Sequence, residues 1–365
     1  MANTCLYPHF FWVLIFQLIH LYFEKQFLLF YSIIYIRTIS KRGFVLSDRK
    51  QVTTWILEGH IPIEKSQDAL KVANSTPSVR EWAYFLQRIF LWSGAIGLTT
   101  AIGFFIAFNW SFVGRLTTFV SLELCILGVL CLYWKQQERN TISQVSLTAL
   151  SLLVGITLAF LGQTYQTGAD SWQLFASWAL MITPWVAIAQ FPLLWIIWIV
   201  LINLTCFQYE FLISIPFYDR SLFHFGLNTL FALSWELSLQ KTQWSSSRWP
   251  IWILSFVGGI HIQALVCNTI LDSEIDLLSF GIYAGWLTGI FAVYRTKIPD
   301  LILNTIATLS VCITIITFVI ELMPDLNEIT YLVIGVIGLC VTSVASLWLR
   351  HIHHMQQSHG ESNES

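Results

Sequence analysis

The chain has 365 residues, of which 56% are hydrophobic and 11% are charged, and its formal net charge is −2. Soluble domains carry about 25% charged residues, so the composition excludes an ordinary water-soluble protein and predicts that lipid surrounds most of the polypeptide. The charges form no basic stripe, and we therefore expect no nucleic-acid partner. The seven cysteines show no CxxC pair and no metal-ligand spacing, so we expect neither a metal site nor a cofactor.

Residues 1–44 form an apolar amino-terminal extension. It contains two apolar runs, 10–23 and 26–36, separated by Glu24 and Lys25. Each run is shorter than the ~20 residues that cross a bilayer. The extension has no basic segment before its apolar part and no small-residue cleavage site, so it does not resemble a signal peptide. Three interpretations stay open: an extra tilted helix, an interfacial helix, and a translation start further downstream.

Residues 45–88 predict a small cytoplasmic helical region, which is where we expect any protein partner to bind. Ser47 or Asp48 can cap a helix that ends before Gly59. A second short helix is expected over residues 63–72. Ser78 can cap a further helix that continues into the membrane.

The segment 89–350 predicts an all-α, polytopic bundle of about ten transmembrane helices, followed by a polar tail over residues 351–365. Each apolar run is about long enough to cross a ~30 Å hydrocarbon core at 1.5 Å per residue. One long apolar block is divided at Pro192 into two helices. The expected spans are 89–109, 116–134, 144–162, 173–189, 192–209, 222–239, 250–269, 277–294, 301–320 and 330–349.

The charges of the loops alternate along the chain. Lys and Arg concentrate before the first expected span and in every second loop, as at Lys241 and Arg248. The loops between them carry acidic residues, among them Glu210 and Asp276. Short loops rich in Lys and Arg stay in the cytoplasm, so both termini are predicted to be cytoplasmic. The amino terminus would change sides if residues 10–36 cross the membrane.

Two carboxylates inside expected spans are candidate functional residues, because burying a charge in a membrane is costly. Glu123 has no cation on its own helix, which suits a proton or ion site; the alternative is a neutral or paired carboxyl that joins helices. Glu236 lies nearer the cytoplasmic interface and is more easily explained by snorkelling. His224 and His261 are expected to make structural hydrogen bonds.

A second candidate site lies at the expected outer surface. The segment 162–170 joins the third and fourth spans and is rich in hydrogen-bonding groups between two glycines. It could cap a pore or bind a polar ligand, or it could be a turn that satisfies its own backbone. The end of the first span lies on the same side, so the two groups could meet. The candidate residues are Asn109, Trp110, Gln163, Tyr165, Gln166 and Asp170.

Glycines in the later spans are expected to let helices pack closely. They comprise the pair Gly258 and Gly259 and a stripe at every fourth position, formed by Gly281, Gly285 and Gly289.

Catalytic signatures are absent from the sequence. There is no glycine-rich phosphate loop, no G-x-S-x-G elbow and no HExxH motif, so no catalytic residue is expected and the pattern favours a non-enzyme. The leading hypothesis is a membrane protein of transporter or channel-like type, with Glu123 as a proton or ion site and residues 163–170 as an outer gate. The second is a scaffold or sensor that acts through residues 46–88. An enzyme acting on lipid-linked substrates ranks last, because no nucleophile and base pair is visible.

Four short motifs occur in a fixed order: WILEGHI at 55–61, FIAFNW at 105–110, GQTYQTGAD at 162–170 and WALMITPW at 178–185. Together they resemble prokaryotic predicted membrane proteins grouped as domain of unknown function 2157. The resemblance covers about residues 45–200. It implies a multi-pass protein of the bacterial inner (plasma) membrane with a small cytoplasmic amino-terminal helical region. It implies no activity, substrate or catalytic residue, and the extension 1–44 departs from the family pattern.

Overall fold

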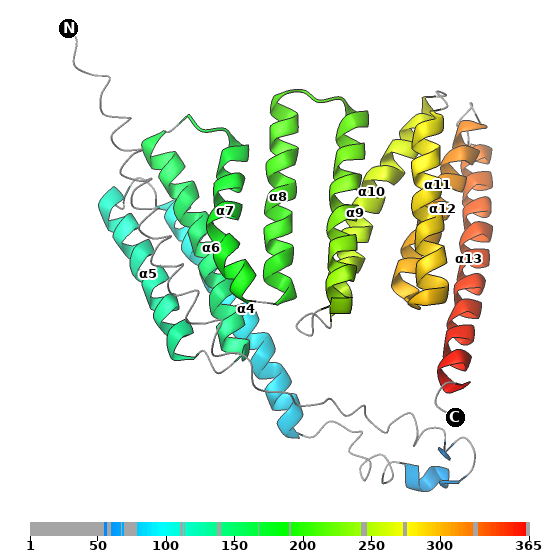
Figure 1. Ribbon diagram of the computed structural model, residues 1–365, viewed down its shortest axis with the longest axis horizontal. Helices are drawn as coiled ribbons and strands as arrows, with labels where there is room; N and C mark the ends of the chain where they lie inside the picture. The colour runs from blue at the N-terminus through cyan, green and yellow to red at the C-terminus, as the bar shows by residue number, and fades with distance from the viewer. Residues whose placement is uncertain are drawn as a thin grey trace. The chain divides into compact units, whose positions relative to one another are not determined.

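The structure is a computed structural model in which ten long helices follow one another along the described part of the chain (Figure 1). The described residues are 55–56, 60–66, 68, 79–109, 112, 114–136, 140–166, 168–189, 191–241, 247–272, 276–323 and 328–362. The predicted extension 1–44 and the candidate Trp110 lie outside these residues. Of the expected cytoplasmic hairpin, Trp55 and Ile56 are helical and Ile63–Lys65 form a short 3₁₀ turn, η1.

The chain divides into two compact units, and the division passes through a single helix, α7. The first unit comprises the residues up to Thr167 together with Met181–Ala189, and the second comprises Gly168–Leu180 together with the residues from Gln190 onward. The helices are α4 (Val79–Phe108), α5 (Arg115–Lys135), α6 (Asn140–Tyr165), α7 (Ser171–Ala189), α8 (Pro192–Leu212), α9 (Phe217–Lys241), α10 (Trp249–Leu271), α11 (Leu277–Ala292), α12 (Leu301–Glu321) and α13 (Glu328–Ser362).

Nine helices in the described part of the chain are long and apolar enough to cross a membrane. The tenth, α9, has 25 residues but is less apolar than the others. Its polar side chains Ser221, His224, Asn228 and Glu236 are buried in the second unit. Because these groups face protein, α9 needs fewer apolar residues than a helix surrounded by lipid. The predicted all-α, multi-pass fold is confirmed.

In the first unit, α6 packs against both α4 and α5. Its apolar side chains Leu150, Leu153 and Val154 are buried. Ser151 on the same helix accepts a hydrogen bond of 2.7 Å from the indole Nε1 of Trp185, which lies in the second half of α7. A buried hydroxyl and a buried indole therefore satisfy each other, as buried polar groups must.

In the second unit, α10 packs against α9, α11 and α12, and α12 packs against α13. The core on α10 includes Leu254, Ile262 and Leu265, all nearly inaccessible to solvent. Gly258 and Gly259 let neighbouring side chains approach this helix, as the sequence predicted: a Cβ at Gly258 would lie 3.4 Å from Asn228 Cβ. The second unit is thus organised around α10.

Several expectations from the sequence were wrong. α6 continues to Tyr165, so the outer loop begins at Gln166 and not at Gly162. Glu210 lies inside α8 and not in a loop. For the polar tail no secondary structure was predicted from the sequence; α13 continues through it to Ser362, and the tail contains no proline to end the helix. The stripe of Gly281, Gly285 and Gly289 supports no close packing among the described residues, since an added Cβ at each would meet nothing within 4 Å.

Candidate functional site

A buried group of polar side chains joins α8, α9 and α10 in the second unit. Its members are Asn203 and Glu210 from α8, His224 and Asn228 from α9, and His261 from α10. Glu210, His224 and Asn228 expose 5%, 2% and 1% of their surface. Polar groups in such a setting are costly unless they are paired. The five residues are hereafter called the polar cluster.

The centre of the polar cluster is a contact between His224 and Glu210. His224 Nε2 lies 2.9 Å from Glu210 Oε2, and His224 Nδ1 lies 3.3 Å from Asn203 Oδ1. Glu210 stands near the carboxyl end of α8 and His224 in the second turn of α9, so the short connection between the helices brings them together. A carboxylate and an imidazole at this distance can share or exchange a proton.

Two asparagine amides complete the hydrogen bonding between α8 and α9. Asn228 Nδ2 donates to Asn203 Oδ1 at 2.8 Å and to the His224 carbonyl at 2.8 Å. Asn203 Nδ2 donates to the Ile199 carbonyl at 3.0 Å. The side-chain orientations are therefore set by several partners each, which gives a preorganised array of donors and acceptors.

His261 extends the polar cluster into a pocket. Its ring stacks on that of His224, with centroids 4.9 Å apart and planes inclined by 19°. Its ring nitrogens make no hydrogen bond with any of the described residues. The pocket has a volume of about 330 Å³, and its polar lining is formed by Asn203, His224, Asn228 and His261. A half-buried histidine with free nitrogens beside a cavity is suited to bind a ligand or a proton.

Arg220 supplies a positive charge at the same end of α9. Its guanidinium lies 5.8 Å from the ring centroid of Phe207 and 5.9 Å from that of Phe217. Electrostatic interactions link Arg220 to Glu210 and to His224. Arg220 thus places a cation, which itself rests on aromatic faces, within electrostatic reach of Glu210.

The candidate Glu236 belongs to a separate ionic network, which we call the arginine network. Arg248 reaches Glu236 at 3.3 Å and Asp300 at 3.0 Å. Tyr294 OH donates to Glu236 Oε2 at 3.1 Å, and Trp252 Nε1 donates to Asp300 Oδ2 at 2.9 Å. Glu236 is only 8% exposed. Pairing with groups from neighbouring helices, and not snorkelling, therefore explains how the bundle accommodates this buried carboxylate.

Glu123 stands apart from both networks. It is exposed on α5 and forms no hydrogen bond or ion pair with the part of the chain that the structure describes. The structure therefore brings none of the other candidates to it. An unpaired carboxyl on a spanning helix must face water, a partner or lipid in its neutral form.

The expected outer cluster is divided by the structure. Asn109 Nδ2 donates to the Phe105 carbonyl of its own helix at 2.9 Å. Tyr165, at the end of α6, stacks with Phe119 of α5 at 6.0 Å. Gln163 and Gln166 are exposed in the first unit, whereas Asp170 is exposed in the second. Two residues of the loop have positive φ, Gln166 at 44° and Gly168 at 64°, which indicates a tight turn. A positive φ favours glycine, which explains why this residue type occupies position 168.

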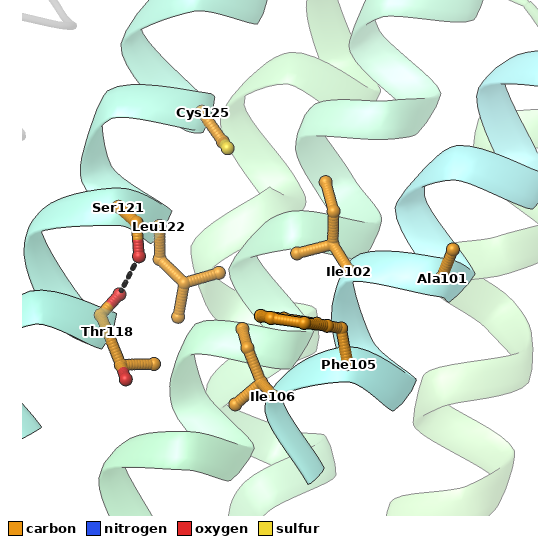
Figure 2. Close-up of a pocket in the computed structure, with 8 residues that line it drawn as sticks. All are labelled: Ala101, Ile102, Phe105, Ile106, Thr118, Ser121, Leu122 and Cys125. Atoms are coloured by element: carbon orange, nitrogen blue, oxygen red, sulfur yellow. Dashed lines mark hydrogen bonds between the residues drawn. The ribbon is translucent and has the colours of Figure 1, made fainter. Parts of the chain in front are cut away.

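A second pocket, of about 370 Å³, lies between α4 and α5 (Figure 2). Ile102, Phe105 and Leu122 project into it. Its hydroxyls are committed to backbone carbonyls of α5: Ser121 donates to Thr117 and Thr118, and Thr118 donates to Gly114. Among the described lining residues, the polar group left without a hydrogen bond is the Cys125 thiol, which is a weak donor. The pocket of the polar cluster lies beside the His261 nitrogens, which make no hydrogen bond in the described part of the chain, and is therefore the better candidate site.

Sequence reasoning missed the role of Glu210 and gave His224 and His261 only a structural role. Glu210 was assigned to an acidic outer loop, because it follows an apolar run. One signal was available: Glu210 and His224 flank a short connection between two helices, so their side chains can meet across the hairpin. Among the described residues, no group of three His, Cys, Asp or Glu side chains could hold a metal ion.

Comparison with known proteins adds the family context. Residues 53–195 match the family model described as "Predicted membrane protein (DUF2157)". The resemblance inferred from the four motifs is thereby confirmed. The DUF2157 segment covers α4 to α7 and ends in α8 before Asn203, so the polar cluster lies beyond it. No curated protein sequence and no solved structure matches the chain.

Proposed function

We propose that this multi-pass membrane protein is a transporter or channel-like protein, and that its second unit moves a proton or a small solute through the polar cluster. The observation that carries the proposal is the buried contact between Glu210 and His224 beside a pocket lined by His261. Ionisable groups inside a membrane bundle are costly and mark proton or solute pathways.

The location of the cluster follows from the charge pattern of the loops. We infer a bacterial inner membrane with both termini in the cytoplasm, since Lys and Arg occupy alternate loops. The connection between α8 and α9 then lies on the outer side, and Glu210 lies close to it. The arginine network lies at the opposite, cytoplasmic ends of α9 and α10. In this arrangement a proton from outside reaches Glu210 first and passes to His224.

Proton movement tests the proposal directly. The full chain is placed in liposomes that enclose a pH-sensitive dye, and a potassium diffusion potential, negative inside, drives protons inward. Wild-type protein is expected to acidify the lumen faster than empty liposomes do, and Glu210→Gln is expected to lower the rate to the empty level. Asp219→Asn is the matched control, because Asp219 is an exposed carboxylate at the same end of α9. Wild-type rates in Glu210→Gln would reject the proposal.

The same assay tests the proposal that Glu123 binds the transported proton or ion. A loss of flux in Glu123→Gln with normal flux in Glu210→Gln would move the site to the first unit. The outer-gate role of Gln163, Tyr165, Gln166 and Asp170 stays a prediction. A gate would show as a change in flux when the loop is shortened.

A second function is favoured by the start of α4. Val79, Trp82, Phe85 and Leu86 are all exposed there, and a helix of 30 residues is about 45 Å long, which exceeds the hydrocarbon core. We infer that this segment, with the region before it, could bind a protein partner as part of a scaffold or sensor. Deletion of residues 46–75 should then abolish recovery of a partner while membrane insertion stays normal.

A further inference from the structure

The pocket of the polar cluster has one chemical bias: its lining includes two protonatable histidine rings and no acid. We propose that it binds a small aliphatic monocarboxylate together with one proton. The inference rests on the proposed function, because it names the substrate class of the same site. It follows from the size of the pocket, the identity of its walls and the arrangement of the two histidines.

The pocket is small and its walls are mostly aliphatic. A volume of about 330 Å³ lies at the lower end of the ~300–1,000 Å³ range of small-molecule pockets, so the ligand is small. Aliphatic side chains dominate the walls, which suits an aliphatic chain. They belong to Ile196, Ile199, Val200, Leu204, Ile253, Leu254 and Val257.

The polar lining selects the sign of the ligand's charge. Asn203, His224, Asn228 and His261 line the pocket, and no Asp or Glu does. The carboxylate of the polar cluster, Glu210, is held by His224 Nε2 and interacts with Arg220. A cation entering the pocket would therefore find no free acid, and burying it without a partner would be costly. An anion finds, once a proton arrives, an imidazolium at His261. The amide N–H groups of Asn203 and Asn228 already donate within the protein, so His261 provides the binding group.

The two histidines determine how many protons the pocket takes up when the ligand binds. Their stacked rings, 4.9 Å apart, cannot both carry a charge without strong repulsion, so the pair takes one proton. His224 already contacts Glu210 and Asn203, whereas the nitrogens of His261 make no hydrogen bond with the described residues. Among those residues the charged and titratable groups that act on His261 are His224 and Arg220, both from α9.

Charge balance then couples the proton to the ligand. The carboxylate brings one negative charge and the histidine pair takes up one proton, so the filled pocket has the same net charge as the empty one. A carboxylate entering alone would be an unpaired charge in a largely apolar cavity, which is unfavourable. Binding should therefore consume about one proton per ligand and weaken as the pH rises.

Calorimetry on the purified full chain in detergent tests this inference with butyrate as the probe. Butylamine and butanol, which have the same carbon chain, report a preference for a cation or for a neutral ligand. We expect butyrate to bind at least about tenfold more tightly at pH 6 than at pH 8. Titrations in buffers of different ionisation heat should show uptake of about one proton. Equal or tighter binding of butylamine or butanol would overturn the proposal, as would butyrate binding without proton uptake.

Variants of α10 assign the binding to His261. His261→Phe keeps a ring that can stack but loses both nitrogens, and it should weaken butyrate binding at least about tenfold at pH 6. Ile260→Phe is the matched control, since Ile260 is an exposed neighbour on the same helix and should leave the affinity unchanged. His261→Gln, which cannot be protonated, should bind butyrate weakly and independently of pH. Wild-type affinity in His261→Phe, or wild-type pH dependence in His261→Gln, would overturn the assignment.

The two proposals fail separately. If wild-type protein moves protons in liposomes but does not bind butyrate, the monocarboxylate inference is wrong and the proposed function stands. If butyrate binds with proton uptake but no flux occurs, the binding site stands and the proposed transport is wrong.

Discussion

Gly259 lies so close to the indole ring of Trp286 that a Cβ atom added to this glycine would come within 3.0 Å of two ring carbons. Gly259 is on α10 and Trp286 is on α11, so the contact sets how closely these helices approach. Trp286 also packs against the core clusters of the second unit, which restricts its freedom to move away.

Gly259→Ala should therefore destabilise the protein by about 1–3 kcal/mol, the usual cost of overpacking a core. Gly285→Ala is the control, because no neighbouring atom in the described part of the chain lies within 4 Å of a Cβ at that position. Both changes carry the same gain in helix propensity, so their difference isolates the clash. Thermal unfolding in detergent measures this difference in stability. Equal melting temperatures for the two variants would show that Trp286 can move away from the added methyl group without cost.

Arg248→Met should be one of the most damaging single changes in the second unit. It removes the cation shared by Glu236 and Asp300 and leaves both carboxylates largely buried. Breaking a buried ionic network by removing one partner costs about 3–5 kcal/mol, and the partial exposure of Arg248 lowers our expectation to about 3 kcal/mol. Adding Glu236→Gln to Arg248→Met should recover part of the loss. A double variant less stable than Arg248→Met would contradict the pairing.

Asp276 should give the protein an acid-sensitive contribution to stability. Hydrogen bonds from Ser279 and Tyr218 lower the pKa of Asp276 from its usual value, and its carboxylate also accepts hydrogen bonds from the first backbone N–H groups of α11. Because the folded pKa lies below the unfolded one, this stabilisation is present above the unfolded pKa and disappears as the pH falls through the folded pKa.

Asp276→Asn should therefore lower the melting temperature at neutral pH and flatten its fall between about pH 5 and pH 3. The measurement is a series of thermal scans of wild type and variant across this range. Asp272→Asn, at an exposed acidic residue of the same connection, provides the comparison. If the melting temperatures of wild type and Asp276→Asn change with pH in parallel, Asp276 is not the source of the acid-sensitive stability.

Gln263 should contribute only modestly to stability, although it links two helices. Its Nε2 donates to Thr314 Oγ1 at 3.0 Å, and its Oε1 accepts from Ser310. Hydrogen bonds between membrane helices average about 0.6 kcal/mol, so Gln263→Leu should cost about 1 kcal/mol for the pair of contacts. Chemical unfolding in mixed micelles measures the change. A loss several times larger would mean that Ser310 and Tyr283, which share a hydrogen bond, cannot satisfy each other without Gln263.

Most of the fold could be predicted from the sequence because the length of an apolar run largely decides whether a helix can cross a bilayer. The division of the long apolar block at Pro192 was predicted for the same reason: a proline fits the first turn of a helix and the residue before it is extended. Glu210 escaped prediction because hydropathy marks where a span ends only to within a turn, and a carboxylate near that end looks like part of a loop.

The faces of the helices were harder to predict. Gly281, Gly285 and Gly289 follow a spacing typical of close packing, yet a Cβ added to any of them meets no atom of the described residues within 4 Å, whereas Gly259 makes the tight contact. In a helix that is apolar all round, the sequence carries little information about which side meets protein and which meets lipid. The stacking of His261 on His224 depends on that rotation and on the pairing of α9 with α10, so only the structure revealed it.

We propose that the polar cluster serves the function of the protein and does not add to its stability. The most direct test compares proton flux in liposomes with thermal stability for the double variant Glu210→Met with His224→Phe, which replaces the buried pair by apolar groups of similar size. Replacing a buried ionic pair in this way is often neutral or stabilising. We predict an unchanged or higher melting temperature together with proton flux no faster than that of empty liposomes. A lower melting temperature with wild-type flux would contradict the claim.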